Sequence, residues 1–211
     1  MKLKLFILVF LCLSVTTHAQ NARAILDKAS AAYNNVGGIS ASFTLDIKDT
    51  KKKQTYSSDG KAWLKGNKFK FETPDGITWF DGKTQWVYIK DSDEVNITTP
   101  TGQELQAISP SAIFNMYKSG FSLTYKGEKI VKGKTVLEVD MVPQKKGQDI
   151  AKITVQIDKS TNIFSSITMI DKSGIQNILT ISKNQTEANI PDITFVFNKK
   201  DFPTAEMIDL R

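Results

Sequence analysis

Hydrophobic positions along this chain follow a helical period once, near the start, and a period of two over most of the remaining length. Between residues 22 and 36 the apolar side chains recur every three or four positions, which predicts an amphipathic helix. Gly37 and Gly38 follow at once and are expected to end it. From Ile39 to Lys48 apolar and polar residues alternate, which predicts a strand with one apolar and one polar face. The apolar stripe of the helix must cover another surface.

The same alternation predicts a series of further strands separated by short turns. Their expected ranges are 56–65, 68–73, 77–80, 85–89, 94–98, 122–125, 135–142, 150–158, 163–170, 175–183 and 194–198. One short helix interrupts them, from Ser109 with Pro110 in its first turn to Tyr117. The turns leave no room for crossover helices, so neighbouring strands should be antiparallel. The predicted fold is mainly β (α+β), with about ten or eleven of these twelve ranges forming strands and with two or three short helices.

The turn Gly66-Asn67 sets a register between two of these strands. A two-residue hairpin there places Leu64 opposite Phe69 and Ala62 opposite Phe71, so the four side chains share one face. Periodicity leaves two interpretations of this apolar face. It is either ordinary core packing or the wall of a ligand cavity.

The first nineteen residues are typical of a secretory signal peptide. Lys2 and Lys4 precede an apolar run over 5–15, and Thr17-His18-Ala19 forms a small-x-small cleavage site. The apolar run is too short for a spanning helix, which needs about 20 residues. Cys12 follows the bulky pair Phe10-Leu11, unlike the cysteine of a lipoprotein signal. We expect cleavage after Ala19, which gives an exported, unanchored single domain over 20–211.

Cleavage would remove both the only cysteine, Cys12, and the only histidine, His18. The mature chain would then have no disulfide, thiol chemistry, imidazole base or zinc site of the Cys or His type, and we expect no metal or cofactor. Only Arg23 and Arg211 are arginines among the basic residues, so nucleic acid is not an expected partner. Lys51-Lys52-Lys53 is interpreted as a hairpin tip, or alternatively as a contact for anionic headgroups or an acidic partner.

Carboxylates on the predicted strands do not form an evident catalytic couple. Most of them alternate with apolar neighbours, which predicts a solvent-facing position; the candidates are Asp46, Glu72, Asp140 and Asp158. We therefore do not expect an enzyme. A carboxylate-based hydrolase remains the competing hypothesis.

Several segments together resemble the outer-membrane lipoprotein carrier family, LolA. The resemblance spans nearly the whole mature chain, and the segments that carry it are 40–44, 60–65, 69–74, 81–88, the 109–114 helix and 195–197. It implies a periplasmic carrier with an unclosed antiparallel barrel and a lid of short helices. It also implies an apolar cavity that takes lipoprotein acyl chains from an inner-membrane ABC transporter to an outer-membrane acceptor. No catalytic group is needed, and we expect a monomer.

On this resemblance nine side chains are predicted to line the cavity. They are Leu26, Tyr33, Phe43, Leu45, Leu64, Phe69, Phe71, Ile113 and Phe114. One departure concerns the lid, because the family commonly has an Arg-Pro pair where this chain has Gly66-Asn67. Either the lid is held in another way, with Lys65 as a substitute, or cargo is handled under different control. The alternative function is a module that binds or senses another lipid in the same cavity.

Overall fold

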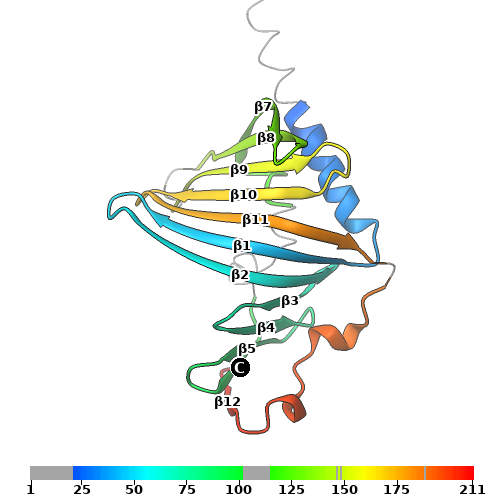
Figure 1. The fold of residues 1–211 in the computed structure, drawn as a ribbon, viewed down its shortest axis with the longest axis vertical. Helices are drawn as coiled ribbons and strands as arrows, with labels where there is room; N and C mark the ends of the chain where they lie inside the picture. Colours follow the sequence, from blue (N-terminus) through cyan, green and yellow to red (C-terminus); the bar gives the residue numbers. More distant parts are fainter. Residues whose placement is uncertain (1–20, 102–114, 146, 148, 188) are drawn as a thin grey trace, which may run out of the picture.

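The computed structural model describes residues 21–101, 115–145, 147, 149–187 and 189–211. A helix occupies 21–34, as the helical period predicts, and is followed by one large sheet (Figure 1). The predicted signal peptide and most of the 109–117 helix, with Ile113 and Phe114, lie outside the described residues. Of that second helix, residues 115–117 are described; residues 115 and 116 are helical, and Tyr117 lies in the turn that follows.

Twelve strands form the sheet. Their bounds are β1 Ile39–Asp49, β2 Gln54–Lys65, β3 Lys68–Glu72, β4 Gly76–Phe80, β5 Gln85–Ile89, β6 Glu94–Thr98, β7 Phe121–Val131, β8 Lys134–Pro143, β9 Ile150–Asp158, β10 Phe164–Asp171, β11 Ile175–Thr186 and β12 Glu206–Asp209. Their spatial order is β12-β6-β5-β4-β3-β2-β1-β11-β10-β9-β8-β7. Two meanders, β1–β6 and β7–β11, therefore join through the β1–β11 pair. With β12 and β7 at opposite edges, the sheet is unclosed, as predicted (Figure 1).

The last segment of the chain differs from the prediction. Instead of a strand over 194–198, the structure has a 3-10 helix at Asp192–Phe195, and a second one follows at Lys199–Asp201. The chain then forms β12, which pairs with β6 in parallel. The expectation that all neighbours are antiparallel is thus wrong for this pair. The long path from β11 to the opposite edge supplies the crossover that a parallel pair needs.

Strand β7 is longer than the predicted 122–125. It continues to Val131 through a register shift between Tyr125 and Gly127. Gly127 has a φ of 103°, a conformation that favours glycine, so the strand passes through a bulge. The bulge and the charged residues after it interrupt the alternation of apolar and polar positions. The second half of this edge strand therefore could not be predicted from the sequence pattern.

The two faces of the sheet differ in what covers them. We call the face on which helix 21–34 packs the helix face, and the other the opposite face. The helix face holds the main core, in which the helix meets strands β8 to β10 and residues of β11 pack alongside. Its buried members are Ala22, Leu26, Ala29, Tyr117, Val139, Met141, Ile153, Val155, Ile157, Phe164 and Ile167. Burial of these side chains is the main force that holds the helix on the sheet.

A smaller apolar cluster lies on the opposite face, over β4 to β6. Phe202 contacts the ring of Tyr88 with 4.6 Å between ring centroids, and Trp79 lies 5.5 Å from Phe197. Val95 and Ala205 are buried beneath them. The C-terminal segment thus packs its aromatic side chains against the sheet, which explains why it does not continue as a regular strand.

Candidate functional site

Aromatic side chains form a continuous strip along the helix face of β1, β3 and β4. Phe43 meets Phe71 edge to face at 6.2 Å, Phe71 lies 5.1 Å from Phe69, and Phe69 stacks on Phe80 at 5.1 Å. We call these four residues the aromatic strip. Leu45 and Leu64 belong to the same face, because Leu45 pairs with Leu179 and Leu64 with Phe69. Leu179 packs against the main core, so the strip and the helix lie on one side of the sheet.

Burial divides the predicted cavity residues into two groups. Phe43, Phe69, Leu26 and Tyr33 are buried. Phe71, Leu45 and Leu64 are half-buried and keep part of their surface accessible. The register predicted for the Gly66-Asn67 hairpin is confirmed, with Leu64 opposite Phe69 and Ala62 opposite Phe71. The half-buried residues are the ones that could contact a ligand without unpacking the core.

Helix 21–34 contributes two of the predicted residues, in different surroundings. Leu26 belongs to the main core over β8 to β10. Tyr33, near the end of the helix, donates a hydrogen bond of 2.8 Å from its hydroxyl to the carbonyl oxygen of Gly66. Burial raises the pKa of Tyr33 to about 12, so the phenol stays neutral and remains a donor. Tyr33 thus fastens the helix to the β2–β3 turn, beside the aromatic strip.

Two residues that build the strip, Phe80 in it and Gly60 beneath it, were not among the residues predicted from the sequence. Phe80 is buried and pairs with Phe69 across β3 and β4, a register that the Pro74-Asp75-Gly76 turn could have indicated. Gly60 lies beneath Phe43, where an added Cβ would come within 2.3 Å of the Phe43 ring and 2.7 Å of the Glu72 carbonyl oxygen. A side chain at position 60 would therefore displace the ring, so the strip depends on this glycine.

Lys65 holds the C-terminal segment. Its ammonium donates to Asn189 Oδ1 at 3.0 Å, to the Ile190 carbonyl oxygen at 2.8 Å and to Asp192 Oδ1 at 2.9 Å. Lys68 reaches the other carboxylate oxygen of Asp192 at 2.7 Å. The three contacts of Lys65 match the three donors of an ammonium group. The proposed substitution of Lys65 for the family's arginine at the lid gains no support from them.

The carboxylate of Asp192 should give this attachment a pH dependence. Hydrogen bonds from Lys65 and Lys68 lower the pKa of Asp192 from 3.8 to about 2. The folded form is therefore favoured by this group above about pH 4, and that contribution is lost as the pH falls toward 2. We expect hydrogen exchange of the 189–196 amides, corrected for intrinsic rates, to accelerate over this interval. An Asp192→Asn variant should show fast exchange at every pH, and identical profiles for the two proteins would contradict this assignment.

Carboxylates named as enzyme candidates are each engaged in a separate local contact. Asp46 accepts from Ser57 at 2.6 Å, Asp140 from Thr154 at 2.6 Å, and Glu72 pairs with Lys70 at 2.6 Å. Asp158 is buried rather than solvent-facing, and its carboxylate accepts hydrogen bonds from the Ser160 hydroxyl and from backbone N–H groups of the following turn. No group of three metal-ligating side chains occurs among the described residues. In that same part of the chain no helix is long and apolar enough to cross a membrane.

Most of this chain matches the model of one known family. The family model described as outer membrane lipoprotein carrier protein LolA matches residues 13–174. The chain belongs to the LolA family. Members of this family are carriers or binding proteins. No curated protein matches the chain.

Solved structures share the LolA fold at low sequence identity. An uncharacterized conserved protein from Thermus thermophilus is 12% identical, with a TM-score of 0.61, over 90% of this chain and 99% of that one. LprF from Mycobacterium bovis is 14% identical, with a TM-score of 0.50, over 82% of this chain and 97% of that one. At such identities the likeness shows the fold alone.

Proposed function

We propose that this LolA-family protein is an exported carrier that holds lipoprotein acyl chains against the helix face of its sheet. The aromatic strip with its half-buried neighbours carries this proposal. The helix-face positions of β1 between Ile39 and Ile47, and of all of β3 and β4, have no charged side chain. Each acyl methylene removed from water contributes about 0.8 kcal/mol, so an apolar wall is sufficient for binding.

Phe71, Leu45 and Leu64 are assigned to direct contact with the acyl chain, because they combine an apolar side chain with remaining exposure. Phe43 and Phe69 support them from the buried part of the strip. Tyr33 holds the helix against the sheet beside this wall, and Leu26 holds the helix over β8 to β10. Ile113 and Phe114 remain proposed lid residues. Transfer from an inner-membrane ABC transporter to an outer-membrane acceptor would follow, after the signal peptide is removed near Ala19.

Extraction of the purified mature protein followed by mass spectrometry tests this function. We expect a triacylated protein or its lipidated N-terminal peptide to be recovered with the carrier. Recovery of free phospholipid alone would instead favour the module for another lipid. A carrier that is purified without detergent and holds no acyl compound would contradict both.

A further inference from the structure

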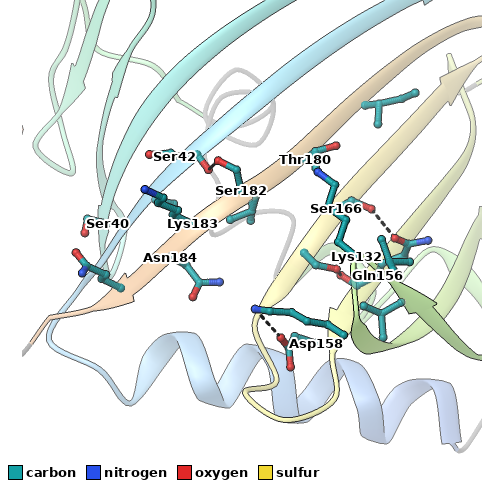
Figure 2. A pocket seen from close by; sticks show the side chains of 18 of the residues that line it. Ser40, Ser42, Lys132, Gln156, Asp158, Ser166, Thr180, Ser182, Lys183 and Asn184 are labelled. Carbon is teal, nitrogen blue, oxygen red and sulfur yellow. Dashed lines mark hydrogen bonds and ion pairs between the residues drawn. The ribbon is translucent and has the colours of Figure 1, made fainter.

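The opposite face of the sheet contains a polar hollow of about 1120 Å³. It lies over β1, β2, β9, β10 and β11, and the tip of the β7–β8 hairpin forms one side of it (Figure 2). Thr180 identifies the face: it stands between Leu179 and Ile181, which pack against the main core, so its side chain points away from the helix. The hollow is therefore separate from the aromatic strip.

Short hydroxyl side chains form the floor of the hollow. They project from three neighbouring strands, and include Ser40, Ser42, Ser166, Thr168 and Thr180. Long side chains stand around them, including Trp63 on β2 and Lys183 on β11. The hairpin tip turns through Lys132 and Gly133, which have φ angles of 49° and 77°. A floor of small residues between long ones creates the depth of the hollow.

Positive charge dominates the lining. Four lysines, Lys61, Lys132, Lys134 and Lys183, face one acidic residue, Asp158. Asp158 is already paired, because Lys134 lies 3.3 Å from its carboxylate. Burial alone would raise the pKa of Asp158, but hydrogen bonds from Ser160, Lys134 and the turn backbone outweigh it and lower the pKa. The carboxylate therefore stays ionised and compensates Lys134 only.

Three of these lysines have unused donors. Within the described part of the chain, the ammonium groups of Lys61, Lys132 and Lys183 make no hydrogen bond or ion pair. By contrast, Lys129 next to the hollow donates to both oxygens of Glu138, at 2.8 and 2.9 Å. The three cations around the floor are thus available to a ligand.

An ordered hydrogen-bond chain fixes one side of the floor. Gln156 donates to Glu138 at 2.9 Å and accepts from Ser166 at 3.2 Å, as Figure 2 shows for the second contact. Lys129 holds the Glu138 carboxylate, and this carboxylate accepts from Gln156. The contacts together fix the orientation of the Gln156 amide. The Ser166 hydroxyl keeps a lone pair for a donor in the hollow.

We propose that this hollow binds an anionic ligand rich in hydroxyl groups, of the polyol phosphate class. Lysine ammonium groups neutralise phosphate as point charges, and serine and threonine hydroxyls both donate to and accept from ligand hydroxyls. Such a group has two sources: a soluble sugar phosphate, or the glycerol phosphate headgroup of a phospholipid. This site does not depend on the proposed acyl-chain function.

Titration calorimetry with two kinds of probe tests the proposal on the mature protein. Glucose 6-phosphate and glycerol 1-phosphate are the soluble probes, and vesicles with phosphatidylglycerol are the lipid probe, with phosphatidylcholine vesicles as the neutral reference. We expect saturable binding to at least one anionic probe and none to glucose. Binding to soluble probes identifies a free ligand, whereas binding to phosphatidylglycerol vesicles alone identifies a headgroup.

Two matched triple variants decide whether the hollow is responsible. Replacement of Lys61, Lys132 and Lys183 by glutamine should weaken binding at least about tenfold. The same replacement of Lys51, Lys52 and Lys53, at the β1–β2 tip, removes equal charge and should change affinity less than about twofold. Thr180→Val, which keeps the charge, should weaken binding several-fold.

Equal losses of affinity in both triple variants, or no saturable binding to any anionic probe, would overturn the proposal. Solubilisation of a lipidated peptide should be unchanged in the first triple, which separates this test from that of the carrier function.

Discussion

Phe71→Glu is expected to yield a folded protein that no longer solubilises a lipidated peptide. Phe71 is half-buried, so a glutamate there can reach water in the empty protein and the fold is retained. With an acyl chain bound, the carboxylate would have to lose solvent against hydrocarbon, which costs several kcal/mol. We expect a loss of at least about tenfold in the amount of peptide kept in solution, measured after removal of detergent.

Thr55→Glu is the matched control, because Thr55 is exposed and its neighbour Tyr56 pairs with Ile47 on the helix face. The control glutamate therefore lies on the opposite face and should leave solubilisation intact. Phe71→Leu should also retain most of it. If Phe71→Glu and Thr55→Glu perform equally well, the helix face is not the acyl-binding surface.

Leu26→Ala should cause a large decrease in the free energy of unfolding. Leu26 is 1% exposed and packs within the main core between the helix and the sheet. Removal of a buried leucine side chain leaves a cavity and lowers the free energy of unfolding by about 2–5 kcal/mol. Urea denaturation followed by circular dichroism should show a lower midpoint with a similar slope.

Lys28→Ala on the same helix is the control for helix propensity, since Lys28 is exposed. Its unfolding free energy should stay within about 0.5 kcal/mol of the parent. A Leu26→Ala midpoint equal to that of Lys28→Ala would mean that the helix is not held by this packing.

The local pattern of residues predicted most of the strands. One face of the sheet is covered, so apolar and polar side chains alternate along each strand. Ile39 to Lys48 alternates cleanly, and the strand formed there extends by one residue only, to Asp49. The turn Gly66-Asn67 indicated the register that places Phe69 opposite Leu64 and Phe71 opposite Ala62. Alternation and turn chemistry are local properties, so they can be read without knowledge of the distant chain.

Residues whose structure depends on distant partners could not be predicted in the same way. Phe197 looks like a strand residue, but the aromatic cluster that it forms with Trp79 and Phe202 decides the conformation of this segment. Strand β12 contains only four residues, three of them exposed, and exists because β6 offers it an edge. Tertiary contact overrides local preference in both segments.

The candidate site, too, could be predicted only in part from the sequence. The hairpin register placed Phe69 and Phe71 on one face, the family resemblance added Phe43 to the cavity wall, and the structure joins the three rings in one strip. Phe80 and Gly60 escaped notice because their roles arise from cross-strand neighbours. The opposite-face hollow was missed as well, since serines and lysines on a strand normally indicate only a solvated surface.

The β1–β11 pair has a consequence for how the protein reaches its native state. Ile39 pairs with Thr186 and Asp49 with Ile175, so this seam joins segments more than a hundred residues apart. Each meander can form from short hairpins, whereas the seam requires closure of the long chain between its strands. The seam should therefore form late, and a chain ending before Ile175 would expose the inner edges of both meanders to self-association.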